Sequence, residues 1–373
     1  MTLAIFTLVE HTFHNNKYYG YAPYIHQINL WIAHAEEVIV VAPKSASQTL
    51  DNIQEAYNHP NVRLVEVPTF HVKGIGGLLK TLVLLPGMFI KMSKVMRKAD
   101  HLHFRCPSNV SAIALLVQMW FPSKRKTAKY AGNWDPKSKQ PIGYRFQKWM
   151  LSNTKLTRNM KALVFGEWPN QSRNIIAFNS ASFSENEKVA FVKRDYQKPF
   201  RFVCIGSLVE GKQPLLSLKI VEGLNKKGIE AHIDFYGEGV LRTDLEQYIV
   251  ENQLEAVAKL HGNQTRATII DALKQSDFSI LPSKSEGWPK AISEAMFFRC
   301  IPIATKVSCL EWMLDYGKRG ILIDNDLESA IDTISKTISS EAMLHELSLA
   351  AFEWSQQFTI ERIQKDIAQV LDK

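Results

Sequence analysis

The chain has 373 residues, which is enough for two globular domains at the usual domain size. With 46% apolar and 22% charged residues, 18 Gly and 15 Pro, its composition excludes a fibrous or disordered chain. The formal net charge is +8, and four cysteines without CxxC spacing exclude a disulfide framework and predict a reducing compartment without a structural zinc site.

Short apolar runs alternate with helical patterns in the first half of the chain. The expected strands are Leu3–Val9, Glu37–Ala42, Val62–Val67, His101–Phe104, Thr127–Ala131 and Ala162–Phe165. The expected helices are Pro23–His34, Leu78–Arg97, Ser108–Trp120 and Tyr144–Asn153. This alternation predicts a parallel sheet with crossover helices.

The second half repeats the same rhythm. The expected strands are Phe202–Ile205, His232–Tyr236, Val257–Leu260, Phe278–Leu281, Ile301–Ala304 and Gly320–Ile323. The expected helices are Pro214–Lys226, Leu241–Glu251, Arg266–Gln275, Ala291–Phe298 and Leu327–Ile338, and residues 341–373 are expected to be wholly helical. A polar stretch over residues 180–199 reads as a linker. We therefore expect two doubly wound α/β domains with a cleft between them and ligands at the carboxyl ends of the strands.

Three glycine or aspartate motifs follow predicted strands. The segment from Gly206 to Gln213 approaches the phosphate-binding P-loop but lacks its final hydroxyl, so it predicts either an anion site at Lys212 or an ordinary turn. Gly237-Glu-Gly239 lacks the third glycine of a dinucleotide fingerprint and reads as a turn. Asp324-Asn-Asp326 resembles a metal-binding acidic pair, but an N-cap explains Asp326 more simply, and we predict no metal site.

Two glutamates follow the strand that ends at Leu281. Glu286 lies in the loop, and Glu294 lies about one turn into the next helix, with N-terminal amides at Lys290 and Ala291 between them. This pattern predicts a pocket for a hydroxyl-rich group beside a phosphate.

The segment Ser283-x-x-Glu286-Gly-x(6)-Glu294-Ala-Met resembles the E-x7-E signature of retaining GT-B glycosyltransferases of family 4. The resemblance covers the second half of the chain. In the first half it is limited to the strand–helix rhythm and the exit segment Phe178-Asn179. It implies an α/β GT-B fold of two Rossmann-like, doubly wound domains facing a cleft, with a C-terminal helix crossing back. The expected divisions are an acceptor domain over 1–185, a donor domain over 186–355 and the returning helix over 356–373.

The resemblance also implies roles for residues of the donor domain. Lys212 and Glu286 would be catalytic: Lys212 neutralises the departing diphosphate, and Glu286 holds sugar hydroxyls of the donor. Glu294 would bind the ribose, and helix amides would cap a phosphate. The residues expected to bind the donor are Gly206, Ser207, Lys212, Gly237, His261, Glu286, Gly287, Lys290, Ala291 and Glu294.

The chain departs from the family's pattern at two places. Ser207 stands where the family commonly has Arg, so one cationic contact to the diphosphate is either missing or supplied from elsewhere, with Arg105 and Lys290 as candidates. The family's usual His after the fifth strand of the first domain is absent, and Asn133 or Asp135 lies in that region. His11 and His14 follow the first strand, where acceptors enter. The acceptor-side candidates are therefore His11, His14, Arg105, Asn133 and Asp135.

The expected function is transfer of a sugar from a nucleotide-diphospho-sugar to a glycan or lipid-linked acceptor, with retention of configuration and without a metal or cofactor (EC 2.4). The setting would be bacterial surface polysaccharide or glycolipid synthesis. A GT-B nucleotide-sugar epimerase and a non-catalytic nucleotide-sugar-binding protein are the alternatives. The donor sugar, the base, the linkage and the oligomeric state are not predicted.

Positive charge is concentrated in the first half. Residues 1–190 contain 23 Lys and Arg against 11 Asp and Glu, whereas residues 191–373 contain 22 against 26. Basic residues between Lys73 and Lys98 flank apolar Leu78–Ile90, so this helix either lies on an anionic membrane or is a core helix with a solvated edge. No RNA-binding motif is present, which disfavours nucleic acid. With neither a signal peptide nor a membrane span, we expect a cytoplasmic protein that is at most peripheral on the membrane's inner face.

Overall fold

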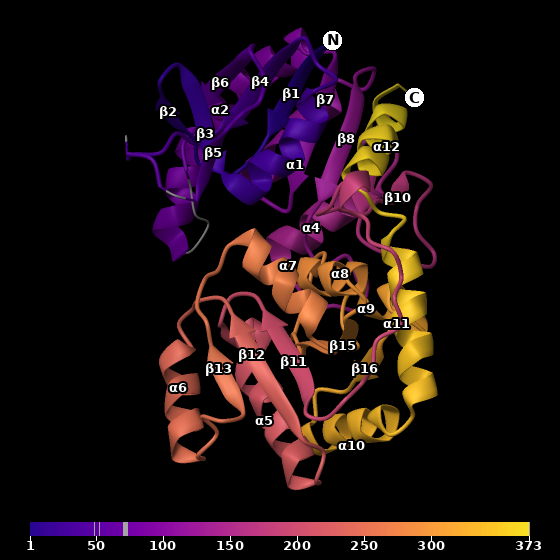
Figure 1. Ribbon diagram of the computed structural model, residues 1–373. Coiled ribbons are helices and arrows are strands. Elements are labelled where there is room, and N and C mark those ends of the chain that lie inside the picture. Colours follow the sequence, from indigo (N-terminus) through magenta and orange to yellow (C-terminus); the bar gives the residue numbers. More distant parts are fainter. Residues whose placement is uncertain (48, 52, 70–73, 373) are drawn as a thin grey trace. The chain divides into compact units, whose positions relative to one another are not determined.

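The computed structural model describes residues 1–47, 49–51, 53–69 and 74–372 (Figure 1). The chain divides into two compact units, which are Met1–Asn179 with Ile363–Lys373, and Ser180–Arg362. Each unit is built on its own parallel sheet flanked by helices, which confirms the predicted fold class of two Rossmann-like α/β domains.

The first unit contains a seven-stranded parallel sheet of order β10-β9-β8-β7-β1-β4-β6. Its strands are β1 (Thr2–Phe6), β4 (Glu37–Ala42), β6 (Val62–Glu66), β7 (His101–Cys106), β8 (Arg125–Tyr130), β9 (Met160–Val164) and β10 (Ile175–Ala177). The crossover helices are α1 (Ala22–Ile32), α2 (Gly74–Lys98), α3 (Asn109–Val117) and α4 (Ile142–Ser152). All six predicted strands are confirmed with small shifts at their ends, and the short β10 of this sheet was missed.

A small antiparallel sheet of the first unit was also missed by the sequence prediction. It comprises β2 (Thr12–His14), β3 (Lys17–Tyr21) and β5 (Gln54–Ala56). Asn15 and Asn16 connect β2 to β3 with positive φ angles of 48° and 60°, as in a two-residue hairpin turn. The Asn-Asn pair was the available signal. His11 and His14 do follow the first strand, as expected, but His14 belongs to the strand β2 and His11 forms an isolated bridge with Lys44.

The second unit has a six-stranded parallel sheet of order β13-β12-β11-β14-β15-β16. Its strands are β11 (Phe200–Ile205), β12 (Ala231–Tyr236), β13 (Ala258–Leu260), β14 (Phe278–Leu281), β15 (Ile301–Thr305) and β16 (Ile321–Ile323). Its helices are α5 (Pro214–Lys226), α6 (Arg242–Glu251), α7 (Arg266–Gln275), α8 (Lys290–Phe297), α9 (Leu310–Met313), α10 (Leu327–Ile338) and α11 (Glu341–Ser355). From β11 the chain builds outward through β12 and β13, then crosses back to β14, so the strand order reverses between β11 and β14. Such a switch point is where open α/β sheets bind ligands.

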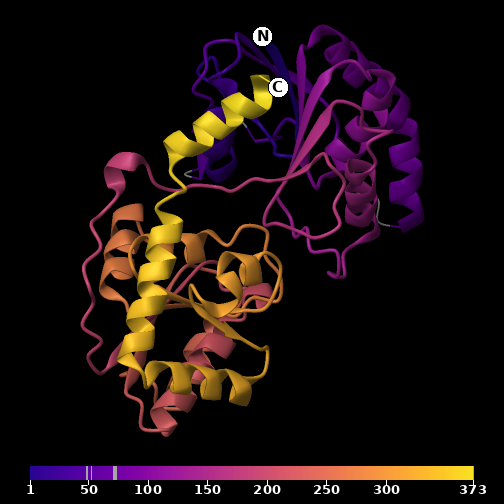
Figure 2. The ribbon, with the colours of Figure 1, turned by 90° about the vertical axis from the view of Figure 1, so that its right-hand side faces the viewer.

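The prediction of one continuous helix over residues 341–373 is wrong. α11 ends at Ser355, and α12 (Ile360–Asp372) starts afresh after Thr359 (Figure 2). The buried Thr359 hydroxyl accepts a hydrogen bond from the Arg362 amide at 3.3 Å and donates one to Glu185 Oε1 at 2.5 Å. A threonine side chain that binds backbone in this way competes with helix continuation.

Helix α12 from Ile363 onward belongs to the first unit. Its buried face consists of Ile363, Ile367 and Leu371. Arg125 and Lys161 donate to the carbonyls of Leu371 and Val370, and cations at this end of a helix are favourable to its dipole. No helix among the described residues combines the length and apolarity that crossing a bilayer requires.

Ile367→Ala tests the packing of α12. The Ile367 side chain is fully buried, so its truncation should destabilise the first unit by about 2–5 kcal/mol through lost burial and the cavity left behind. Gln369→Ala, at an exposed position of the same helix, should change stability by less than about 0.5 kcal/mol. Urea unfolding measures both, and equal effects would contradict the assigned face.

Candidate functional site

Two loops meet at the switch point of the second unit. The β11–α5 loop contains Glu210 and Lys212, and the β14–α8 loop contains Lys284 and Glu286. The Lys284 amide donates to the Gly211 carbonyl at 2.9 Å, which brings the two backbones together. Lys284 pairs with Glu210 at 2.6 Å, and Lys212 pairs with Glu286 at 2.5 Å. The loops are therefore joined by two ion pairs, and each loop supplies the cation of one pair and the carboxylate of the other. The outer pair is exposed, and the inner pair is partly buried.

The inner pair places the two predicted catalytic side chains together. The Glu286 side chain is 7% exposed, and that of Lys212 is 32% exposed. The Glu286 amide donates to Ser308 Oγ at 2.9 Å, and Cys309 Sγ donates to the Gly287 carbonyl at 3.1 Å. The loop after β15 thus supports the Glu286 loop from behind, so the carboxylate is held in place without a ligand.

The glycines of the first two turns allow a close backbone approach. Gly206 and Gly237 have φ angles of +142° and +145°. A Cβ atom at Gly237 would lie 2.0 Å from the Gly206 carbonyl oxygen, so any side chain there would displace one turn from the other. Lys212 lies in a short 3₁₀ turn (Glu210–Lys212) that ends before α5 begins at Pro214. The turn therefore does not lead directly into the helix as a P-loop does.

His261 is held by side chains that sequence reasoning did not identify. Its Nε2 lies 2.5 Å from Asp234 Oδ1, and its ring stacks on Tyr236 with centroids 4.6 Å apart. Asp234 and Tyr236 lie on β12, beside β13 and the loop that carries His261. The period-2 spacing of these residues at the end of a predicted strand was the signal that could have found them.

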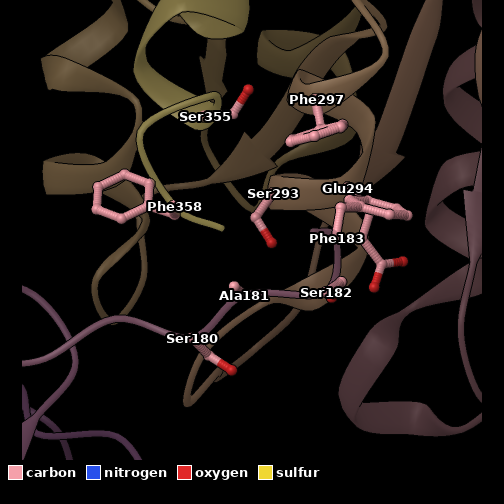
Figure 3. Close-up of a pocket in the computed structure, with 9 residues that line it drawn as sticks. All are labelled: Ser180, Ala181, Ser182, Phe183, Ser293, Glu294, Phe297, Ser355 and Phe358. Atoms are coloured by element: carbon pink, nitrogen blue, oxygen red, sulfur yellow. The ribbon is translucent and has the colours of Figure 1, made fainter. Parts of the chain in front are cut away.

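Glu294 lies on α8 and lines a pocket with residues 180–183. Its carboxylate points toward the chain segment 180–183 and receives a hydrogen bond from Ser182 (Figure 3). Burial raises the pKa of Glu294, and Ser182, Lys290 and Arg266 oppose this shift. The pocket that Glu294 lines with this segment has a volume of about 10 Å³, which is the size of one water molecule.

The remaining donor-side candidates are distributed around these loops. Ser207 is exposed, whereas Lys290 and Ala291 are half-buried at the start of α8. The first amides of a helix have no acceptor within the helix. Those at the start of α8 therefore point toward the end of the β14–α8 loop.

The acidic Asp324-Asn-Asp326 motif has a structural role. Asp326 accepts a hydrogen bond from the Ser329 amide at 2.9 Å, which confirms the predicted N-cap of α10. Asp324 pairs with Lys306 at 2.9 Å. Within the described part of the chain, no group of three or more His, Cys, Asp and Glu side chains is arranged to hold a metal ion.

The acceptor-side candidates lie in the first unit. His11 is fully buried, lies 2.6 Å from the Tyr57 hydroxyl and has its pKa lowered to about 4 by burial, so it is neutral at pH 7. His14 is exposed at the end of β2. Asn133 and Asp135 accept hydrogen bonds from the amides two residues ahead, each at 2.8 Å, and so stabilise turns of their own loop. Arg105 lies near the end of β7.

The arrangement of the second unit agrees with comparisons to known proteins. Residues 185–354 match the family model described as glycosyl transferases group 1. An uncharacterized glycosyltransferase of Methanocaldococcus jannaschii is 23% identical over 207 residues, and this alignment spans 54% of each chain. The capsular polysaccharide biosynthesis glycosyltransferase CapH of Staphylococcus aureus is 26% identical over 125 residues, which is 32% of this chain and 34% of CapH. The chain thus spans about half the length of the Methanocaldococcus jannaschii protein and about a third of the length of CapH.

The fold is shown over the whole chain. The structure of Anabaena HepE in complex with UDP and glucose covers 100% of this chain and 99% of its own, with a TM-score of 0.65 at 14% identity. The chain therefore has the GT-B fold.

Glu294→Gln tests the cost of burying this carboxylate. A raised pKa means that the folded unit binds a proton more tightly than the unfolded chain, so the carboxylate destabilises the fold as pH rises above its ordinary range. The Glu294→Gln variant should therefore gain melting temperature relative to the unmodified protein as the pH rises from 4 to 8. At pH 8 the difference should reach a few degrees. Glu353→Gln, at an exposed position of α11, controls for the loss of one carboxylate. The same pH trend in both variants would contradict the interpretation.

Proposed function

We propose that the protein is a retaining, metal-independent glycosyltransferase that moves a sugar from a nucleotide-diphospho-sugar to a glycan or lipid-linked acceptor. The observation that carries this proposal is the Lys212–Glu286 pair at the switch point of the second unit, inside the region that matches the group 1 transferases. A cation and a carboxylate at this point suit a ligand with both phosphate and hydroxyl groups.

Lys212 acts on the leaving group. When the bond between the anomeric carbon and the diphosphate oxygen breaks, negative charge develops on the diphosphate, and the Lys212 ammonium stabilises it. The acceptor oxygen forms the new bond on the face that the diphosphate leaves, and the acceptor's proton passes to the departing diphosphate. Configuration at the anomeric carbon is thereby retained.

Glu286 has two roles in this proposal. It orients Lys212 through their ion pair, and it accepts hydrogen bonds from sugar hydroxyls of the donor. Glu294 would hold the ribose, and the amides at the start of α8 would cap a phosphate. Because lysine and helix amides supply the positive charge, the proposal requires neither a divalent metal nor a cofactor besides the nucleotide-sugar.

The acceptor and cellular setting follow from relatives. CapH is named for capsular polysaccharide biosynthesis, and HepE was crystallised with UDP and glucose. By analogy, we propose that the donor of this chain is a uridine or related nucleotide-sugar. We also propose that the chain acts in surface polysaccharide or glycolipid synthesis on the inner face of the membrane.

Helix α2 supplies a membrane-facing surface for such a role. Leu82, Val83 and Ile90 are exposed by 53%, 80% and 56%, although Met88 and Met92 of the same helix are buried in the core. Lys94 and Arg97 are exposed further along, whereas Lys73 lies outside the described residues. Exposed apolar side chains beside cations favour contact with anionic lipid.

Glu286→Gln and Lys212→Gln test the catalytic pair. Each should lower the rate of sugar transfer by about 100-fold or more, because each removes charge that is positioned for the transition state. Lys284→Gln, which breaks the exposed pair between the same two loops, should change the rate by less than about fivefold. The measurement is product formation from a panel of nucleotide-sugars with glycan and lipid-linked acceptors, in buffer containing EDTA.

The same assay separates the alternatives. Free sugar released equally with and without acceptor would indicate an epimerase, and donor binding without any turnover would indicate a binding protein. Loss of transfer in EDTA, restored by a divalent metal, would overturn the metal-independent mechanism. Full transfer by Glu286→Gln would overturn its assigned role.

Val83→Glu combined with Ile90→Glu tests the membrane surface. The doubly charged variant should bind vesicles containing 30% phosphatidylglycerol at least about tenfold more weakly than the unmodified protein, measured by flotation at two salt concentrations. Val240→Glu, an equally exposed position of the second unit, should bind as the unmodified protein does. Vesicle binding that is the same in all three proteins would contradict the assignment of α2.

A further inference from the structure

The first unit contains an open pocket at the carboxyl ends of β1, β7 and β8. Its volume is about 390 Å³, which lies in the range of small-molecule sites. The residues that line it include no aspartate or glutamate, and among them are Thr7, Tyr24, Arg105 and Ser108.

Arg105 is the charged side chain of this pocket. It is partly buried, donates to Gln27 Oε1 at 3.0 Å and lies over the Tyr24 ring with 5.5 Å between its guanidinium carbon and the ring centre. Among the described residues, no carboxylate forms an ion pair with it. Burial lowers the pKa of Arg105.

Several arginines of the second unit have carboxylate partners. Arg194 and Arg201 share Asp277, and Arg242 lies between Glu238 and Glu246. A buried charge normally requires such a partner, because desolvation costs several kcal/mol per ion. Within the described part of the chain, the partners of Arg105 are a neutral amide and an aromatic face, so its charge is available to an anion.

The surroundings reinforce a positive potential. Lys129 lies beside Arg105 in the β7–β8 register, and its buried side chain donates to the Phe178 carbonyl at 2.6 Å. Ser108 caps α3 at the pocket's edge, with its side chain accepting from the Ser111 amide. The positive end of the α3 dipole therefore opens on the same pocket as Arg105.

We infer that this pocket binds an oxyanion, a phosphate or carboxylate group, with Arg105 as its principal charged contact. The inference rests on the proposed function in one respect, which is that this oxyanion belongs to the sugar acceptor. The planar fork of guanidinium N–H groups suits two oxygens of one such group. An acceptor with a phosphate ester or a uronic acid next to the reacting sugar has this chemistry.

The experiment is calorimetric titration of the full chain with glycerol 3-phosphate and, separately, with glucuronate. The unmodified protein should bind at least one of the two, and the stronger one identifies phosphate or carboxylate as the group. Arg105→Gln should weaken that binding by about tenfold to a hundredfold, and Arg105→Lys should recover only part of it, since lysine keeps the charge but not the fork. Arg63→Gln, which removes one exposed cation from the edge strand β6, should bind as the unmodified protein does.

A parallel titration with UDP checks the second unit in the same variants. Unchanged UDP affinity in Arg105→Gln shows that the variant is folded and that Arg105 serves a site separate from the donor. If Arg105→Gln weakens UDP binding and leaves both small anions unaffected, Arg105 is a donor contact and the inference is overturned. Binding of neither anion by the unmodified protein also overturns it. Failure of the proposed function instead appears as absent transfer, whatever the two anions do.

Discussion

The ion pair between Lys212 and Glu286 is the interaction on which the second unit's site depends. It joins loops that follow two adjacent strands, β11 and β14, at the point where the strand order reverses. Glu286 is buried, so removing its partner would leave a carboxylate in a poorly solvated place, a costly state. The pair therefore keeps both side chains in position before any ligand arrives, and a phosphate that binds Lys212 enters a site already organised by Glu286.

The two units pair their buried cations with different groups. In the second unit most buried or half-buried cations meet carboxylates, as Lys212 and Arg194 do. In the first unit lysines donate instead to backbone carbonyls: Lys126 to Arg158, Lys129 to Phe178 and Lys148 to Trp134. Burial lowers the pKa of Lys126 to about 8, yet it stays mostly protonated at pH 7. Part of the basic excess is thus internal, and carbonyl partners leave its net charge intact.

The strand–helix rhythm predicted the two sheets well, because buried parallel strands read as short apolar runs. The bounds of α5 and α7 are those expected, since proline starts the first and Thr265 caps the second. The pairing of Lys212 with Glu286, 74 residues apart, could be anticipated only from family resemblance and the switch-point rule. The ion pair of Lys284 with Glu210 and the support from Ser308 had no local signal, because they depend on which loops become neighbours.

Glu294 shows where a motif underdetermines geometry. The motif fixes the number of residues between Glu286 and Glu294. The direction of the Glu294 carboxylate, however, depends on what covers helix α8. That cover is the segment ending at Phe183, whose ring packs on Phe297, and the amide of Ile360 donates to the Phe183 carbonyl at 2.9 Å. The surroundings of the Glu294 carboxylate are thus set by residues more than 50 positions away along the chain in both directions, and the motif itself contains no signal for them.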